Sequence, residues 1–321
     1  MGFLGVGSVA RYHAEAVHAL GHVVTVGCGQ SPDSPRWAEF KTVAPQARFE
    51  NNGRSLLGNP EIDAVVSCLP WNATESWLPE LLSTQKPVLL EKPIALSSDA
   101  LAHAMEHGMV TLENKYVGFN RRFYQTVQEL KRRVEQGGME SAEITISETV
   151  ESLAKTYGED IVAHILAYSS SHILDTARYI LGPLSPIRVY ASGKAQAFSP
   201  ISGLLETGLG APVHLSVLSE NPVPVGIRIF FDDQTTWHLS PMERLTAYKG
   251  YDRSEPTAES KIRRYTPKPF LEMEEDSDFK PGFLEQMRAF TEGDTNTISA
   301  SPEESLKLLR FIETMQNWTS T

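Results

Sequence analysis

The feature that most constrains the fold is a glycine pattern at the start of the chain. Gly5 and Gly7 are followed by a small residue, Ala10, in the order G-x-G-x-x-A. The pattern lies between an apolar pair typical of a strand and residues 8–20, which favour a helix. There the first glycine permits the tight turn, the second lets the backbone approach a pyrophosphate, and the small residue lets helix and strand pack. The alternative is a tight strand–helix turn that binds no ligand.

The first 120 residues alternate short apolar strands with helical segments. We expect further strands at residues 23–26, 64–69 and 88–90, and helices at residues 36–43, 77–82 and 98–107. Strands that are apolar on both faces and alternate with helices predict a parallel sheet covered by helices. Right-handed crossovers make this a doubly wound, or Rossmann, sheet.

The second half of the chain has a different pattern. We expect strands at residues 142–149, 187–191, 213–219, 226–231 and 235–240, and helices at residues 161–181, 283–290 and 302–318. Strands in succession predict a mostly antiparallel sheet, with the long helix on one face. Residues 252–278 are charged and rich in proline, which favours an extended surface excursion. We therefore divide the chain into a dinucleotide-binding domain at residues 1–118 and a second α/β domain at residues 119–321.

Composition excludes several classes of partner and site. The chain has 40 acidic and 29 basic residues, a net charge of −11, which argues against nucleic acid and anionic membranes as partners. No apolar run reaches the roughly 18–20 residues of a membrane span, and the first residues lack signal-peptide features. The two cysteines, Cys28 and Cys68, are consistent with a reducing cytoplasm, and no metal-ligand spacing is present.

The end of the second strand selects between nicotinamide cofactors. An acidic residue there binds the ribose 2′-hydroxyl of NAD. In this chain Gln30 and Ser31 occupy the first positions after the strand, and Asp33 comes only after a proline. Ser31 and Arg36 are instead suited to a 2′-phosphate. We therefore predict NADP(H) as the preferred cofactor, with NAD as the alternative.

Three later motifs join the opening glycines. Glu91-Lys92-Pro93 follows a strand, residues 117–123 have the sequence V-G-F-N-R-R-F, and residues 171–182 contain an H-x-x-D core. Together the motifs resemble the Gfo/Idh/MocA oxidoreductase family over about residues 2–182. The resemblance implies a Rossmann domain with an E-K-P motif and a second α/β domain with a large open sheet. It also implies a homodimer or homotetramer formed through that sheet.

The resemblance gives Lys92 the central role. In the family this lysine lies near the nicotinamide and hydrogen-bonds the reacting oxygen of the substrate. The chemistry agrees, because hydride transfer from a carbinol leaves an O–H proton that needs a base, and the reverse reaction needs a donor that polarises the carbonyl. The alternative for Lys92 is an exposed lysine in a loop after a strand.

His172 aligns with the family's catalytic or substrate-binding histidine, the alternative being a structural helix histidine. Many members carry an aspartate one helical turn earlier, where this chain has Tyr168. A tyrosine is neutral at pH 7, since its reference pKa is about 10. Tyr168 is either the acid itself, with a pKa lowered by Lys92, or a packing residue. Asp175 is expected in a supporting role.

Two arginines, Arg121 and Arg122, lie at the predicted domain junction. On an extended strand they would point to opposite faces, so that only one faces the site and binds a carboxylate or phosphate. The predicted cofactor-binding residues are Gly5, Gly7, Ser8, Val9, Gln30, Ser31, Arg36, Leu69, Pro70, Trp71, Glu91, Lys92 and Arg121. The predicted catalytic residues are Lys92, His172 and Tyr168, and the predicted substrate-binding residues are Lys92, Asn120, Arg122, His172 and Asp175.

The function implied is hydride transfer between a nicotinamide cofactor and a hydroxyl or ketone of a sugar, sugar derivative or cyclitol. The alternative is a non-catalytic dinucleotide-binding sensor on the same fold. Trp71 and Thr74 stand where the family often has asparagine and histidine, and the three glycines common before the H-x-x-D helix are absent. These departures predict a reshaped substrate site.

Overall fold

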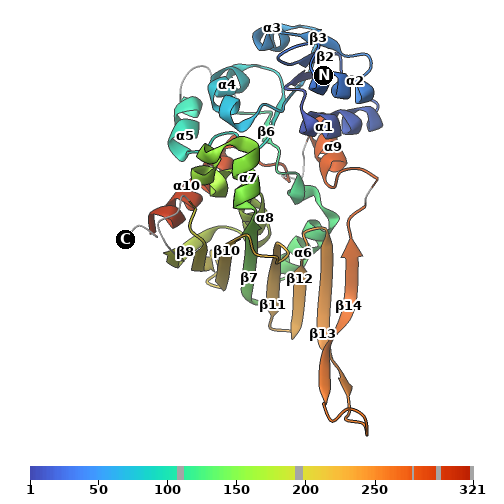
Figure 1. Cartoon of the computed structure of the whole chain (residues 1–321), viewed down its shortest axis with the longest axis vertical. Coiled ribbons are helices and arrows are strands. Elements are labelled where there is room, and N and C mark those ends of the chain that lie inside the picture. Colours follow the sequence, from blue (N-terminus) through green and yellow to red (C-terminus); the bar gives the residue numbers. More distant parts are fainter. Residues whose placement is uncertain (107–111, 192–197, 277, 294–297, 319–321) are drawn as a thin grey trace. The chain divides into compact units, whose positions relative to one another are not determined.

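The computed structural model describes residues 1–106, 112–191, 198–276, 278–293 and 298–318. It divides into two compact units (Figure 1). The first comprises Met1–Phe123, Leu166–His172 and Asp276–Thr314, and the second comprises Tyr124–Ile165, Ile173–Glu275 and Met315–Thr321. The division predicted at residue 118 did not anticipate that two later segments of the chain return to the first unit.

The first unit contains a six-stranded parallel sheet, which confirms the predicted Rossmann fold. Its strands are β1 (Gly2–Leu4), β2 (Val26–Cys28), β3 (Arg48–Glu50), β4 (Val65–Ser67), β5 (Val88–Leu90) and β6 (Lys115–Val117), in the order β3-β2-β1-β4-β5-β6. The helices between them are α1 (Ser8–Ala19), α2 (Pro35–Val43), α3 (Gly53–Gly58), α4 (Trp71–Ser83) and α5 (Ser98–Glu106). Residue 107 of the predicted helix at 98–107 lies outside the described residues. The strand order reverses between β1 and β4, where doubly wound sheets bind ligands at the strands' carboxyl ends.

Burial of apolar side chains explains this sheet. All residues of β1, β2, β4 and β5 are buried, as expected for strands that helices cover on both faces. On α1 the buried side chains recur at Ala10, His13, Ala14 and Val17, a spacing that places them on one helix face. This face packs into a core that includes Phe3.

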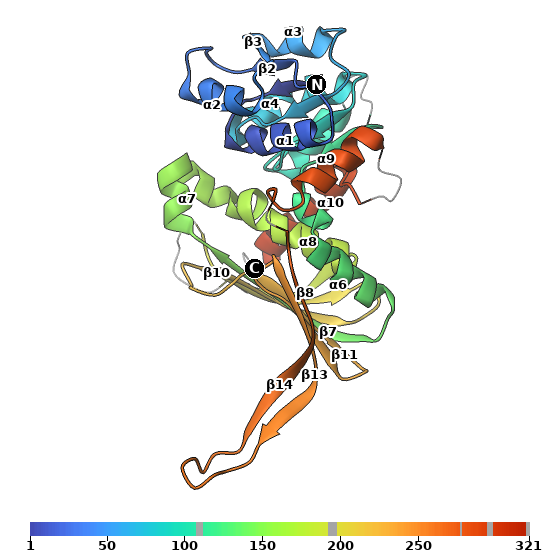
Figure 2. The ribbon, with the colours of Figure 1, turned by 90° about the vertical axis from the view of Figure 1, so that its right-hand side faces the viewer.

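The second unit contains an eight-stranded sheet that is mostly antiparallel, as predicted. Its strands are β7 (Met139–Glu148), β8 (Leu184–Ala191), β9 (Ile201–Thr207), β10 (Pro212–Ser219), β11 (Gly226–Phe231), β12 (Thr235–Leu239), β13 (Arg244–Ser254) and β14 (Arg264–Glu274). Their order is β14-β13-β12-β11-β7-β10-β9-β8, and only β7 and β10 pair in parallel. Figure 2 shows α6 (Gln125–Glu135) and α8 (Ser171–Leu181) on one face of this sheet.

Two strand segments of this half differ from the sequence prediction. The expected excursion at residues 252–278 belongs largely to a ribbon of β13 and β14, which extends beyond the neighbouring strands (Figure 2). Pro267 and Pro269 lie within β14, and a proline is tolerated there because β14 is the edge strand. The second difference is β9, where no strand was predicted.

The long helix predicted at residues 161–181 is three consecutive segments. A 3₁₀ helix spans Glu159–His164, a π-helical turn spans Leu166–Ser170, and only then does α8 begin. The apolar periodicity continues through all three, which is why it predicted one helix. Isolated π-helical turns are frequent at functional sites.

Two helices follow the second sheet in the sequence, α9 (Phe283–Glu292) and α10 (Pro302–Trp318). A capping box starts α10, because the Ser301 amide donates to Glu304 and the Glu304 amide donates to the Ser301 hydroxyl. Between the β13–β14 ribbon and α9, residues 276–282 belong to the first unit. Among the described helices, none has the length and apolar character needed to cross a membrane.

Candidate active site

The glycine turn joins β1 to α1. Gly5 has a φ of +95°, and a Cβ atom there would lie 2.4 Å from the carbonyl oxygen of Cys68, so only glycine fits. A Cβ atom on Gly7 would meet nothing within 4 Å. Gly7 is the N-cap of α1, no side chain caps the helix, and its first turn has no acidic residue. The amide groups at Ser8 and Val9 therefore begin a helix whose N-terminus is open to an anion, which fits a pyrophosphate.

The turn after β2 presents several polar side chains. The Ser31 hydroxyl accepts the Asp33 amide at 3.1 Å, and the Ser34 hydroxyl caps α2. Gln30 and Arg36 are exposed, with Arg36 in the first turn of α2. Asp33 is also exposed, but it lies beyond the first positions after the strand. The turn at the carboxyl end of β2 thus offers the Ser31 hydroxyl, the Gln30 amide and the Arg36 guanidinium.

The turn after β4 is held by a threonine. Pro70 is the N-cap of α4, and the Thr74 hydroxyl donates to the Pro70 carbonyl at 3.1 Å. Thr74 is buried, so the position where the family often has histidine supports the backbone here. Leu69 and Trp71, on either side of Pro70, are half-buried.

Glu91 connects the E-K-P motif to the first helix. One carboxylate oxygen, Oε1, lies 2.7 Å from Nε2 of His13, and the other, Oε2, accepts the Lys92 amide at 3.2 Å. His13 is fully buried on α1, and the ring of Phe283 lies 4.7 Å from its ring. The Gly118 backbone approaches Glu91 so closely that a Cβ atom there would lie 3.0 Å from the carboxylate carbon. The Glu91 carboxylate therefore holds the backbone of Lys92.

His13 was absent from the predicted site. Its signal in the sequence is a polar side chain on the otherwise apolar face of α1, two turns after the glycine pattern. That signal predicts a buried, hydrogen-bonded group, because burial without a partner costs free energy. It does not identify Glu91 as the partner.

The ammonium group of Lys92 lies against Tyr168. Its Nζ donates to the Tyr168 carbonyl oxygen at 3.1 Å and lies 5.3 Å from the centroid of the Tyr168 ring. Tyr168 belongs to the π-helical turn. The carbonyl oxygen accepts an N–H of the amine, and the ring face makes a cation–π contact with it.

His172 lies one residue into α8, close after this turn. The Phe119 ring meets its imidazole edge-on at 5.8 Å between centroids. Burial lowers the pKa of His172 well below its usual value, and the nearby charges of Lys92, Arg121 and Lys280 lower it further. Part of the residue's surface stays exposed. The imidazole is therefore neutral at pH 7 and able to accept a proton.

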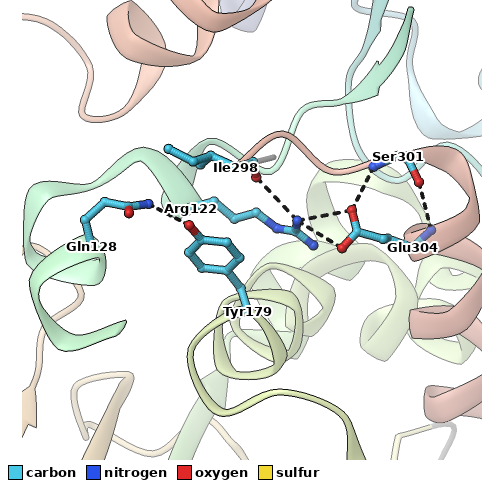
Figure 3. A network of polar contacts seen from close by, with 6 residues as sticks. All are labelled: Arg122, Gln128, Tyr179, Ile298, Ser301 and Glu304. Atoms are coloured by element: carbon cyan, nitrogen blue, oxygen red, sulfur yellow. Dashed lines mark hydrogen bonds and ion pairs between the residues drawn. The ribbon is translucent and has the colours of Figure 1, made fainter. Parts of the chain in front are cut away.

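The two neighbouring arginines lie in a 3₁₀ turn, Asn120–Phe123, so the expected extended strand at this place is wrong. Figure 3 shows the Arg122 guanidinium between the Ile298 carbonyl and the Glu304 carboxylate, at 3.4 and 3.3 Å. Arg122 is 4% exposed. The carboxylate that Arg122 binds is thus that of Glu304. These contacts give no support to the predicted contact of Arg122 with substrate.

Asn120 and Arg121 complete this turn. The Asn120 side-chain amide donates to the Pro281 carbonyl at 2.9 Å, which binds the turn to the segment before α9. Arg121 is half-buried, and its side chain makes no hydrogen bond or ion pair with any described residue. Asp175 is buried on α8 within the second unit, and its role stays a prediction. The described residues include no group of three acidic, histidine or cysteine side chains able to hold a metal ion.

Comparison with known proteins bears on this arrangement. The family described as "Oxidoreductase family, NAD-binding Rossmann fold" matches residues 1–114. Residues 1–114 therefore match the model of the Gfo/Idh/MocA oxidoreductase family. The Gfo/Idh/MocA motifs Gly5-x-Gly7 and Glu91-Lys92-Pro93 both lie within the matched residues.

Relatives extend the match beyond the first domain. "Uncharacterized oxidoreductase YrbE" of Bacillus subtilis is 28% identical over 206 residues, 60% of this chain and 57% of that protein. An inositol 2-dehydrogenase of Acidothermus cellulolyticus is 28% identical over 143 residues, 43% of this chain and 41% of the relative. The matches thus span about half the length of these relatives. A myo-inositol dehydrogenase structure from Corynebacterium glutamicum is 15% identical, covers 99% of this chain and 96% of its own, and has a TM-score of 0.72. That similarity shows that both domains of the fold are shared.

Proposed function

We propose that this Gfo/Idh/MocA member is a nicotinamide-dependent oxidoreductase that acts on a CH–OH group of a sugar, sugar derivative or cyclitol. One observation carries the proposal: the Lys92 side chain contacts Tyr168 of the π-helical turn, and His172, whose pKa is lowered by burial, follows that same turn. Hydride transfer to or from an alcohol carbon needs such a pair, one group to polarise the oxygen and one to accept its proton. The inositol 2-dehydrogenase relative supports this class of substrate.

The residues of the glycine turn fit the dinucleotide. We assign Gly5, Gly7, Ser8 and Val9 to its pyrophosphate, because Gly7 leaves open space before an uncapped helix N-terminus. When bound, the nicotinamide cofactor supplies the hydride acceptor or donor, and the protein supplies binding and orientation.

We infer a preference for NADP(H) from the turn after β2. The exposed Arg36 guanidinium and the Ser31 hydroxyl suit a 2′-phosphate, and no carboxylate occupies the first positions after the strand. Titration with NADPH and NADH tests this inference. We expect NADPH to bind at least about tenfold more tightly and Arg36→Gln to remove the difference. Equal or tighter binding of NADH by the wild type would contradict it.

The proposed mechanism divides the work between two side chains. In the oxidation direction Lys92 donates a hydrogen bond to the substrate oxygen and holds it in place. Neutral His172 accepts the hydroxyl proton while the C–H electron pair leaves as hydride. In the reduction direction the Lys92 ammonium polarises the carbonyl and protonated His172 returns the proton. We favour His172 over Tyr168 as the acid–base group, because Tyr168 presents its ring face and its backbone carbonyl to Lys92.

The sensor alternative predicts a different experimental result. A protein that only senses a dinucleotide has no use for an ammonium group and a neutral imidazole at one turn. The test is the change in nicotinamide absorbance with the wild-type protein and Lys92→Met, using a panel of cyclitols, sugars and sugar acids. We expect turnover by the wild type only. Dinucleotide binding without turnover of any compound in the panel would favour the sensor.

We also propose that the chain forms a homodimer or homotetramer through the eight-stranded sheet. Large apolar side chains are exposed on four of its strands: Ile187 and Tyr190 on β8, Leu204 on β9, Tyr251 on β13, and Tyr265 and Phe270 on β14. These strands form the two ends of the sheet, β8 and β9 at one end and β13 and β14 at the other, and a contiguous exposed apolar patch marks an interaction site. Light scattering after gel filtration measures the mass. We further propose a cytoplasmic location, since both cysteines are free.

A further inference from the structure

One hydrogen bond joins the two backbone segments that carry two basic residues outside the proposed catalytic pair. The Asn120 side-chain amide donates to the Pro281 carbonyl at 2.9 Å. Arg121 follows Asn120 in the 3₁₀ turn, and Lys280 precedes Pro281 in the segment before α9. This hydrogen bond fixes the backbone of both residues in the same part of the first unit.

Both basic side chains act on His172. Phe119, two residues before Arg121, contacts the His172 ring edge-on. Arg121 and Lys280 join Lys92 among the charges that lower the pKa of the imidazole. Lys280 also lies 5.3 Å from the centroid of the Tyr12 ring, on the exposed face of α1. The charges of Lys92, Arg121 and Lys280 therefore all act on His172 and favour its neutral form.

Two acidic residues lie near these basic residues in the sequence or the fold, and neither forms an ion pair with Arg121 or Lys280. The Glu91 carboxylate is bound by His13 and by the Lys92 amide. Asp278, two residues before Lys280, is exposed and its amide donates to Asp276. Within the described part of the chain, no carboxylate forms an ion pair with Arg121 or Lys280.

The neighbouring arginine, unlike Arg121, has a carboxylate partner. Arg122 is paired with Glu304, and in the second unit Arg133 is paired with Asp233. Arg121 and Lys280 have no such partner among the described residues, although the chain has a net charge of −11. An anionic group on a ligand would be attracted to both cations.

We propose that the substrate carries an anionic group, a carboxylate, which Arg121 and Lys280 bind while Lys92 and His172 act on the hydroxyl carbon. A guanidinium group binds a carboxylate through two parallel hydrogen bonds, and an ammonium group adds a point charge. The substrate is thus a sugar acid rather than a neutral sugar or cyclitol. The inference rests on the proposed function, which places the substrate at Lys92 and His172.

An equilibrium titration tests this without needing turnover. The protein is first saturated with reduced dinucleotide, and this binding is monitored by tryptophan fluorescence. The binary complex is then titrated with pairs of a sugar acid and the matching neutral sugar. D-glucuronate and D-glucose differ only at C6, and D-galacturonate and D-galactose form a second pair. We expect at least one acid to bind about tenfold or more tightly than its neutral partner, as charge-assisted hydrogen bonds provide.

Variants assign the preference to the two cations. We expect Arg121→Gln and Lys280→Gln each to reduce the preference severalfold and the double variant to abolish it. Because the proposal assigns Arg121 to the substrate, whereas the sequence predicted a cofactor-binding role, dinucleotide affinity should stay unchanged. Lys307→Gln, which removes an exposed charge on α10, serves as the control and should keep the full preference. Circular dichroism and the unfolding midpoint show whether each variant is folded.

Two results would overturn the proposal. One is a panel in which no acid binds more tightly than its neutral partner. The other is a loss of dinucleotide affinity in Arg121→Gln and Lys280→Gln with an unchanged preference for the acid, which would assign the cations to the phosphates of the cofactor. Failure of the proposed function is seen separately, as the absence of turnover or as turnover that does not need Lys92.

Discussion

The imidazole Nε2 of His13 lies 2.7 Å from Oε1 of Glu91, and this contact joins the helix after the glycine turn to the loop that carries Lys92. His13 has no exposed surface, and the Glu91 side chain is 13% exposed. Glu91 therefore links the helix of the proposed dinucleotide site to the backbone of the proposed catalytic lysine.

Replacing His13 by leucine should lower stability and turnover together. The change leaves the Glu91 carboxylate without its partner, which costs about 1–3 kcal/mol of unfolding free energy. Loss of the His13–Glu91 contact also leaves the Lys92 backbone less firmly held, and we expect turnover to fall by about tenfold or more. Urea unfolding and steady-state kinetics measure the two effects.

The matched controls are His13→Gln and His18→Gln. The first keeps an N–H donor at the buried position and should recover part of both losses. His18 is exposed on the same helix, so its replacement should change neither quantity. A His13→Leu protein as stable as the wild type would show that the contact contributes nothing.

Alanine at Gly5 and at Gly7 should give opposite results. Gly5→Ala forces a Cβ atom to 2.4 Å from the Cys68 carbonyl at a positive φ, so we expect a loss of about 2 kcal/mol or more of stability. Gly7→Ala meets no atom within 4 Å, and its φ of −77° is ordinary. It should keep stability within about 1 kcal/mol and weaken dinucleotide binding about tenfold, because the methyl group occupies the phosphate's approach. Thermal unfolding measures the loss of stability, and a dinucleotide titration measures the loss of affinity. Wild-type dinucleotide affinity in Gly7→Ala would contradict the proposal that the phosphate binds at this turn.

The lowered pKa of His172 predicts how activity and stability depend on pH. The His172 imidazole stays neutral at pH values below its usual pKa of about 6.5, so it can still accept a proton at those pH values. The acid limb of kcat/KM for oxidation should therefore have its midpoint below pH 6.5. Lys280→Gln removes one of the charges that lower this pKa and should move the limb to higher pH. A midpoint at or above 6.5 in the wild type would contradict the assignment of His172 as the base.

The same shift affects folding. Because the folded pKa is lowered, the unfolded chain binds the proton at a higher pH than the folded protein does. Stability therefore falls as the pH drops from 6.5 towards the folded pKa. Unfolding free energies at pH 7.5 and pH 5 should differ less for His172→Gln than for the wild type; equal differences would show that His172 does not titrate in this way.

Two substitutions at Tyr168 distinguish a ring from a hydroxyl. Tyr168→Phe keeps the aromatic face and the backbone carbonyl that contact Lys92, so turnover should stay within about threefold of the wild type. Tyr168→Leu removes the ring, and we expect a fall of about tenfold. If the phenylalanine protein is as impaired as the leucine protein, the hydroxyl of Tyr168 is the acid.

Local signals in the sequence predicted much of the fold. The helix at residues 302–318 is bounded as expected because Ser301, Pro302 and Glu304 form a complete start signal. The β13–β14 ribbon was missed because Pro267 and Pro269 argue against a strand, and only the edge position of β14 makes them tolerable. Whether a strand lies at an edge is decided by partners elsewhere in the chain.

The site was predictable where a motif defines it and not where distant contacts decide. Gly5, Gly7 and Lys92 follow from local patterns. The partner of Arg122 is 182 residues away, and that of His13 is 78 residues away. Within the 3₁₀ turn Arg122 pairs with Glu304 while the charge of Arg121 acts on His172, and the expectation of an extended strand did not predict this turn. No local pattern marks Lys280.

The central claim is that Lys92 and His172 form a hydride-transfer site, and steady-state dinucleotide reduction by a panel of sugars, sugar acids and cyclitols tests it most directly. We predict that the wild type oxidises at least one compound and that Lys92→Met and His172→Gln each lower kcat about 100-fold or more, with dinucleotide affinity unchanged. Turnover by Lys92→Met at the wild-type rate, or tight dinucleotide binding with no turnover of any compound, would contradict the account.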